Sequence, residues 1–207
     1  MADVAALKGP TAMGMVKMMS DDAGANWNFS IAAAADEIAP KLIQGELDIA
    51  AVPANLAATL YNKTQGKVQV LAVNTLGVLY IVENGDTIHS VQDLKGKTIY
   101  TSGKGATPEY ALNFILTSNG IDPATDVTID FRSEHTECLT ALLSNEGSVA
   151  MLPQPFLTTA MMKQEGIRMA LDLNQLWANV QEGKENPSAL LTGVVVARTE
   201  FIQNNPE

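Results

Sequence analysis

The chain has 207 residues, of which 46% are apolar and 17% charged, a composition typical of a packed globular protein and not of a disordered one. Acidic residues outnumber basic ones by 23 to 13, so the formal net charge is −10. Nucleic acid and anionic membrane surfaces are therefore not expected partners, because both require a basic face. The single cysteine, Cys138, excludes an internal disulfide. No apolar run reaches the 18 residues of a membrane span.

The first predicted elements are a strand at 4–7 and a helix that begins in the turn 9–12, where Thr11 would be the N-cap. No signal peptide precedes them. The last residues, 204–207, have the pattern of an N-cap followed by a proline at the start of a helix. We therefore expect the sequence to be a piece of a longer chain.

An internal repeat organises the middle of the chain, because residues 29–60 and 129–160 align without a gap at an offset of 100. The identical pairs are Glu37/Glu137, Leu42/Leu142, Glu46/Glu146, Ala50/Ala150, Pro53/Pro153 and Thr59/Thr159. Each copy reads strand, acid-opened helix, glycine turn, strand and proline-opened helix. The predicted bounds are 28–32, 35–44 and 48–52 in the first copy, and 128–131, 134–145 and 148–152 in the second.

The elements upstream of each copy also match, since the strand and turn at 4–12 parallel a strand at 98–101 and the turn at 105–108. There Thr107 is expected to cap a helix that has Pro108 at its first position. Strand–helix alternation of this length predicts parallel sheets covered on both faces.

Four further strands complete the organisation, at 68–73, 78–82, 168–173 and 193–197, the first two separated by a turn at 74–77. We place the crossings between lobes near 76–83 and 190–196. The predicted fold is α/β, with two similar doubly wound lobes joined by crossing hinge strands. Lobe 1 would hold 1–78 and 191–207, and lobe 2 would hold 79–190. The alternative is one continuous doubly wound sheet.

Turn formers and small polar residues follow the predicted strands at the edge where open parallel sheets bind ligands. Helix starts at such an edge favour an anion or a polar oxygen, although a tight strand-to-helix turn would use the same residues. The candidate ligand-binding residues are Gly9, Pro10, Thr11, Ala12, Asn55, Asn74, Ser102, Ala106, Thr107, Glu134, Gln154 and Trp177.

Several of these candidates have a structural alternative of their own. Asn55 and Gln154 would serve equally as helix caps. Glu134 at a helix start more often compensates the helix dipole than contacts a ligand. Trp177 would line the cleft or pack in the core.

Enzyme signatures are sparse. His89 lies in a polar turn, and His135 and Cys138 lie three apart on one predicted helix, with no other ligand near enough for a zinc site. Cys138 is expected to be a small buried hydrophobe. No serine-hydrolase elbow, zinc-protease motif or dinucleotide-binding glycine set is present. We therefore expect no catalytic residue, metal or cofactor.

Several segments resemble substrate-binding proteins of ABC transporters, of the type that handles nitrate, sulfonates such as taurine, and thiamine precursors. The most specific is Ser90–Ile99 followed by Gly103–Leu112. Gly45–Pro53, Asp172–Trp177 and Thr192–Val196 are also similar.

The resemblance implies a two-lobed, type 2 periplasmic-binding-protein-like receptor outside the cytoplasmic membrane. Such a receptor closes on a small solute and delivers it to a membrane permease. In this family the loops after the first strands of each lobe meet the ligand, which points to 9–12, Asn55, Ser102 and Thr107. Members continue past Glu207 with further helices, and some are lipoproteins.

The leading hypothesis is therefore an extracytoplasmic, monomeric receptor for a small polar or anionic solute. The alternatives are an enzyme of thiamine-pyrimidine biosynthesis on the same fold and a ligand-sensing module.

Overall fold

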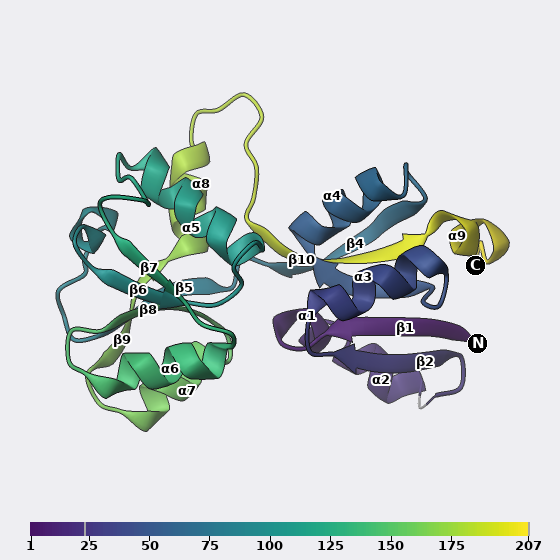
Figure 1. Cartoon of the computed structure of the whole chain (residues 1–207), viewed down its shortest axis with the longest axis horizontal. Helices are drawn as coiled ribbons and strands as arrows, with labels where there is room; N and C mark the ends of the chain where they lie inside the picture. Colours follow the sequence, from purple (N-terminus) through teal and green to yellow (C-terminus); the bar gives the residue numbers. More distant parts are fainter. Residues whose placement is uncertain (23, 207) are drawn as a thin grey trace. The chain divides into compact units, whose positions relative to one another are not determined.

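The computed structural model describes residues 1–22 and 24–206. The chain divides into two compact units, of which unit 1 holds residues 1–76 and 191–207 and unit 2 holds 77–190. Each contains its own five-stranded sheet (Figure 1). The fold is α/β with two doubly wound units, and the alternative of one continuous sheet is wrong. Among the described residues, no helix is long and apolar enough to cross a membrane.

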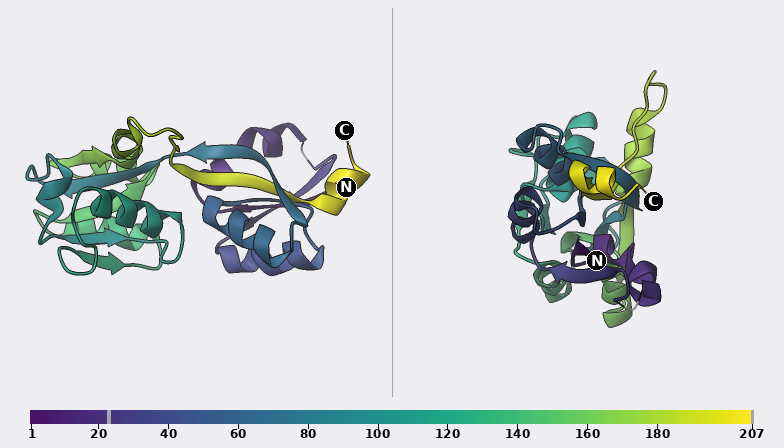
Figure 2. Two further views of the ribbon diagram at one scale, coloured as in Figure 1. Left: turned by 90° about the horizontal axis from the view of Figure 1, so that it is seen from above. Right: turned by 90° about the vertical axis from the view of Figure 1, so that its right-hand side faces the viewer.

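Unit 1 has the strand order β2-β1-β3-β10-β4. The strands β1, β2 and β3 are parallel, and β10 runs antiparallel between β3 and β4. The carboxyl ends of β1 to β4 therefore meet at one edge, which we call the carboxyl edge of the unit. Figure 2 shows β4 and β10 side by side along their length. The bounds are β1 (Ala2–Leu7), β2 (Trp27–Ala32), β3 (Ile49–Pro53), β4 (Val68–Leu76) and β10 (Leu191–Arg198).

Helices cover both faces of this sheet. The first face packs Ile38, Leu42 and Leu60 of α3 and α4 against the strands, and the second packs Ala12 and Met15 together with residues of α2 and α9. Burying each large aliphatic side chain contributes about 1.5–3 kcal/mol. The bounds are α1 (Pro10–Met13), α2 (Val16–Asp22), α3 (Ala35–Gln44), α4 (Ala54–Lys63) and α9 (Thr199–Asn204).

Unit 2 repeats the arrangement with the order β7-β6-β8-β5-β9. Here β6, β7 and β8 are parallel, and β5 runs antiparallel between β8 and β9. The strands are β5 (Leu79–Asn84), β6 (Thr98–Thr101), β7 (Thr128–Phe131), β8 (Val149–Pro153) and β9 (Ile167–Asp172). The helices are η1 (Val91–Leu94), α5 (Thr107–Ser118), α6 (His135–Ser144), α7 (Phe156–Lys163) and α8 (Leu173–Gln181).

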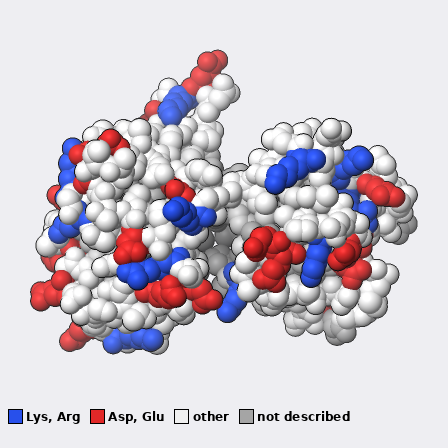
Figure 3. Space-filling model, in the orientation of Figure 1, with Lys and Arg blue, Asp and Glu red and all other residues white. Residues whose placement is uncertain are grey.

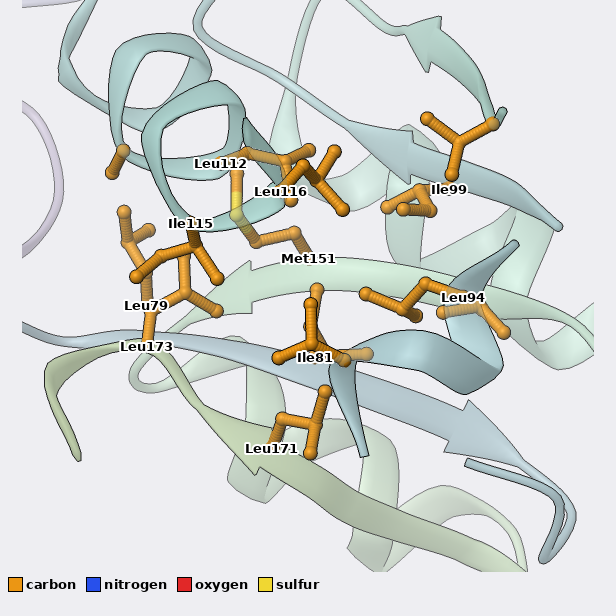
Figure 4. Close-up of a cluster of buried hydrophobic side chains, with 14 of the residues drawn as sticks. Leu79, Ile81, Leu94, Ile99, Leu112, Ile115, Leu116, Met151, Leu171 and Leu173 are labelled. Carbon is orange, nitrogen blue, oxygen red and sulfur yellow. The ribbon is translucent and has the colours of Figure 1, made fainter. Parts of the chain in front are cut away.

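The larger core of unit 2 lies between α5 and the sheet. Figure 4 shows Leu112, Ile115 and Leu116 of α5 facing Ile81 and Met151 of the central strands. On the opposite face, α6 and α7 bury a second cluster that includes Cys138. Burial raises the pKa of the Cys138 thiol to about 11, so this residue is a core hydrophobe, as the sequence predicted.

The internal repeat is confirmed in the elements themselves. The helices α3 and α6 occupy 35–44 and 135–144, and the strands β3 and β8 occupy 49–53 and 149–153. The repeated glutamate has one task in both copies: the Ala34 N–H donates to Glu37 Oε1 at 3.0 Å, and the Ser133 N–H donates to Glu137 Oε2 at 3.0 Å. A carboxylate in the first turn thus satisfies the backbone at each helix start.

Three predicted helix starts were wrong by one or two residues. Gly9, at a φ of 113° that favours glycine, is the N-cap of α1, so Thr11 lies inside the helix. Ala106, not Thr107, is the N-cap of α5. In the second repeat Pro153 still belongs to β8, and Pro155 precedes α7.

One prediction about a loop also needs correction. The turn predicted at 74–77 is strand as far as Leu76, because β4 stays paired with β10 up to Leu191. At the other end, Asn205 follows α9, and the helix start predicted at 204–207 reaches Glu207, which lies outside the described residues, so it stays a prediction.

Candidate functional site

At the carboxyl edge of unit 1, the end of β4 is tied to the loop that opens α1. Asn74 Nδ2 donates to the Thr11 carbonyl oxygen at 2.9 Å, and Thr75 Oγ1 donates to Asn74 Oδ1 at 3.3 Å. Thr11 and Thr75 are both buried. The candidates Gly9, Pro10, Thr11, Ala12 and Asn74 therefore form one connected cluster in the structure.

Two glycines make this close approach of backbone possible. A Cβ on Gly193 would lie 2.8 Å from Thr75 Oγ1, and a Cβ on Gly14 would lie 2.9 Å from the Asn74 carbonyl oxygen. Neither glycine was predicted as a site residue, because a glycine at a close approach of backbone is recognised only once the neighbouring strand is known.

Asn55 lies in the first turn of α4, directly after β3, and is half-buried. Its carbonyl oxygen accepts a hydrogen bond from Thr59 Oγ1 at 3.1 Å. Pro53 precedes the helix as its N-cap, so Asn55 itself is not the cap. The residue faces the same sheet edge as the loop at 9–12.

The carboxyl edge of unit 2 brings together Ser102, which follows β6, and His135, which opens α6 after β7. Ser102 Oγ lies 2.7 Å from His135 Nδ1. Ser102 is only 4% exposed, and the imidazole packs against the Phe156 ring with 5.1 Å between ring centroids. The spacing in the sequence suggested Cys138 as the neighbour of His135, whereas the contact with Ser102 depends on the adjacency of β6 and β7.

The protonation state of His135 follows from its surroundings. Burial disfavours the imidazolium and lowers the pKa of His135, while the neighbouring Glu134 carboxylate acts in the opposite direction. The net shift is downward, so the imidazole is neutral at pH 7. A neutral imidazole has one nitrogen that accepts a hydrogen bond and one that donates.

The turn between β6 and α5 satisfies much of its own backbone. The Ala106 N–H donates to the Gly103 carbonyl oxygen at 3.0 Å, and the Gly105 N–H donates to Glu109 Oε2 at 2.5 Å. Pro108 has no N–H. Ala106 is half-buried and Thr107 is buried. The alternative of a tight strand-to-helix turn therefore accounts for part of this loop.

Gln154 and Glu134 lie at the same edge and have local partners. Gln154 Oε1 accepts from Thr158 Oγ1 at 2.9 Å in the first turn of α7. Glu134 is exposed, and its Oε2 accepts from Thr136 Oγ1 at 3.3 Å. Gln154 Oε1 also accepts from the Thr158 N–H at 3.4 Å, as in helix capping, whereas Glu134 is the N-cap of α6 but its side chain makes no capping hydrogen bond.

Trp177 is placed by packing. Its ring centroid lies 4.3 Å from that of Phe114, and its Nε1 donates to the Ser188 carbonyl oxygen at 3.1 Å. The indole thus joins α8 to α5 and holds the segment that leads into β10. In the described part of the chain, it makes no hydrogen bond or ring contact with the other candidates of unit 2.

Basic side chains that the sequence analysis did not single out flank the carboxyl edge of unit 2. Lys104 Nζ lies 5.7 Å from the centroid of the Phe131 ring, and the Arg132 guanidinium lies 5.4 Å from that of Tyr100. In the view of Figure 3, basic and acidic side chains alternate over each unit without one dominant basic area. Local cations therefore supply positive charge in an acidic chain.

A hollow of about 610 Å³ in unit 1 lies at the opposite edge of the sheet, beside Lys63, Lys67 and Arg198. The Arg198 guanidinium is already engaged by Asp48 Oδ1 at 2.6 Å and by the Leu47 carbonyl oxygen at 3.0 Å. This hollow contains none of the sequence-predicted candidates. Within residues 1–22 and 24–206, no three metal-binding side chains gather.

The fold of this chain is also found in solved structures. An ABC transporter protein from Parabacteroides distasonis is 23% identical with a TM-score of 0.75, and the match covers 98% of this chain and 67% of that one. The periplasmic aliphatic sulphonate binding protein SsuA from Escherichia coli is 15% identical with a TM-score of 0.73, covering 99% and 67%. A putative periplasmic sulfonate-binding protein SsuA from Methylobacillus flagellatus KT is 19% identical with a TM-score of 0.69, covering 100% and 63%.

At these identities the structures establish the fold, and the chain spans about two thirds of their length. The family follows from the sequence itself. Residues 12–205 match the family described as ABC transporter, phosphonate, periplasmic substrate-binding protein, and the chain belongs to that family. It is thus a solute receptor of an ABC importer. No curated protein sequence matches the chain.

Proposed function

We propose that this receptor binds a small polar or anionic solute through the loops at the carboxyl edges of its units and closes on it by hinge bending. The observation that carries the proposal is the place where the chain passes between units. β4 ends at Leu76 and β10 begins at Leu191, both at the carboxyl edge of unit 1. β5 begins at Leu79, at the carboxyl edge of unit 2. Because the chain connects the two units at these edges, a hinge is expected next to the loops that follow the strands.

The chemistry of both loop clusters supports a solute with polar oxygens. Unit 1 offers Asn74 and Thr75, whose side chains donate and accept hydrogen bonds. Unit 2 offers Ser102 with Lys104 and Arg132 nearby. We keep the loop at 9–12, Asn55, Ala106, Thr107, Glu134 and Gln154 as candidate contacts, and we assign Trp177 to packing.

The family is periplasmic, so the receptor works outside the cytoplasmic membrane and its partner is the membrane permease of the importer. We propose that it acts as a monomer and that it is either free in the periplasm or held at the membrane by a lipid anchor. Size-exclusion chromatography with light scattering tests the first point. Metabolic labelling with a fatty-acid analogue in the native cell tests the second.

The alternative of an enzyme is supported by a single observation. The distance of 2.7 Å between Ser102 and His135 would suit a nucleophile and its general base. A serine nucleophile also needs a group that orients the base, and no hydrogen bond to His135 Nε2 is found among the described residues. Cys138, with its raised pKa, is unsuited to nucleophilic attack. We therefore propose a receptor without catalysis.

A thermal-shift screen of the purified protein tests this function directly, with sulfonates, phosphonates, nitrate, carboxylates and pyrimidines as probes. A solute present at about 100 times its Kd should stabilise the folded protein by about 2.7 kcal/mol. Mass spectrometry should recover that solute unchanged after overnight incubation. Conversion of the stabilising solute would favour an enzyme, and no stabilisation by any probe would contradict the proposed receptor.

A further inference from the structure

The contact between Ser102 and His135 gives unit 2 a titratable partner for a candidate solute-binding hydroxyl, a feature not found among the described residues of unit 1. Ser102 carries one hydroxyl hydrogen and two lone pairs. Its side chain makes one hydrogen bond among the described residues, to His135 Nδ1 at 2.7 Å. Because Ser102 is 4% exposed, water competes little with this contact.

We propose that His135 sets the hydrogen-bonding polarity of Ser102 toward the solute: Ser102 presents an acceptor when the imidazole is neutral and a donor when it is protonated. When Nδ1 is unprotonated, it accepts a hydrogen bond from the Ser102 hydroxyl, and only the lone pairs of Ser102 remain for a solute. When Nδ1 carries a proton, it donates a hydrogen bond to Ser102 Oγ. The hydroxyl hydrogen of Ser102 can then form a hydrogen bond with the solute. The proposal rests on the proposed function, which places Ser102 in the solute site, and makes His135 a positioning residue.

The surroundings of His135 contain few groups that could override this coupling. The strand β8, which packs along α6, contributes no titratable side chain. Among the titratable groups on α6 and the elements near it, Glu134 raises the pKa of His135, and burial outweighs it. The ionisable residues of these elements are Glu134 and Glu137 at the start of α6, Cys138 within it, Asp130 and Arg132 around β7, Tyr100 on β6, Tyr80 and Glu83 on β5, and Lys163 on α7.

The consequence is a preference in the chemical class of solute. At neutral pH, Ser102 would favour a group that carries a hydrogen, such as an ammonium or a monoprotonated oxyanion. A fully deprotonated oxyanion would bind better once the pH falls through the lowered pKa of His135, because it then gains both a donor and a positive charge. By linkage, binding of such an anion should raise the pKa of His135.

The first arm of the test is independent of any solute. The chain has two histidines, so His89→Asn leaves His135 as the only imidazole for nitrogen-15 NMR. We expect Nδ1 to be unprotonated at pH 7.5, and its signal to move in Ser102→Ala but not in the matched control Ser133→Ala. A neutral imidazole with the proton on Nδ1 at pH 7.5 would overturn the proposal.

The second arm uses sulfate and methanesulfonate, whose charges stay constant above about pH 4. It compares pH 7.5 with a pH below the His135 pKa that the NMR titration gives. Affinity for the anion that binds should rise about 3- to 10-fold at the lower pH, an effect the size of one hydrogen bond. The rise should vanish in His135→Asn and shrink in Ser102→Ala. A rise of full size in Ser102→Ala would mean that imidazolium charge acts alone, which overturns the proposal.

The two proposals fail in different ways. If neither anion binds at either pH while the NMR result holds, the anion receptor under the proposed function is contradicted and the coupling of His135 to Ser102 stands. If an anion binds equally well at both pH values, the receptor stands and the coupling is wrong.

Discussion

The two units share one strand order, yet each secures the edge opposite the carboxyl edge with a different carboxylate–arginine pair. In unit 2, Glu83 is fully buried and accepts from Arg168 at 2.8 Å, from Thr87 and from the Ile88 N–H. In unit 1, Asp48 and Arg198 meet at 2.6 Å, but their side chains remain 17% and 22% exposed. Because Glu83 is buried, breaking its pair with Arg168 should cost much stability. Solvent can reach the pair of Asp48 and Arg198, so breaking that pair should cost less.

The largest effect is expected for Glu83→Ala, which leaves Arg168 without its buried partner and two backbone N–H groups without an acceptor. This change should destabilise unit 2 by about 3–5 kcal/mol, whereas Asp48→Ala should cost unit 1 about 2 kcal/mol. The two tryptophans report on the units separately, Trp27 on unit 1 and Trp177 on unit 2. Urea unfolding followed in Trp27→Phe and Trp177→Phe backgrounds measures each cost. Equal costs would show that burial does not distinguish the pairs.

Lowering the pH should reproduce part of the destabilisation of unit 2 that is expected for Glu83→Ala. Burial favours the protonated form of Glu83, but the hydrogen bonds from Thr87 and Ile88 and the charge of Arg168 outweigh it, so the net pKa lies below 4.5. A lowered folded-state pKa stabilises the fold above the unfolded value, and this stability is lost as the pH falls through the folded pKa. Unit 2 should therefore lose stability below about pH 4.5, and Glu83→Gln should flatten this dependence. The same pH profile in both proteins would assign the acid sensitivity to other groups.

A smaller effect is expected at the carboxyl edge of unit 1. A Cβ at Gly193 would meet Thr75 Oγ1 at 2.8 Å and Asn74 Oδ1 at 3.0 Å. Gly193→Ala should cost about 1–3 kcal/mol by overpacking, seen in the Trp27 signal and not in that of Trp177. It should also weaken solute binding, because it displaces Asn74. A shift of the Trp177 transition alone would contradict this placement.

The smallest effect is expected on β4, which has the same outer place in its sheet as β9 has in unit 2. Val70 on β4 is 55% exposed, whereas Leu171 on β9 is 9% exposed and packs in the core of Figure 4. Val70→Thr should change stability by no more than about 0.5 kcal/mol, while Leu171→Ala should cost about 2–5 kcal/mol. Chemical denaturation checks both. A large loss from Val70→Thr would mean that another part of the protein covers β4.

Much of this architecture was predictable because it depends on local pattern. The bounds of the helix at 35–44 and the strand at 98–101 were confirmed to the residue. Acidic residues in the first turn of a helix and alternating apolar and polar residues in a strand can be recognised within a few positions of sequence. The Ser102–His135 contact was not predicted, because it depends on β6 and β7 being neighbours. Gly9 displaced Thr11 as a cap because the backbone there takes a positive φ, which the residue types alone did not distinguish.

The central claim is that one solute contacts both carboxyl edges, and a calorimetric titration of that solute tests it most directly. Asn74→Ala in unit 1 and Ser102→Ala in unit 2 should each weaken binding about 10-fold, the loss of one hydrogen bond to a polar or charged group. The exposed Ser133→Ala should leave affinity unchanged. Loss of affinity from only one of the two edges would contradict the account.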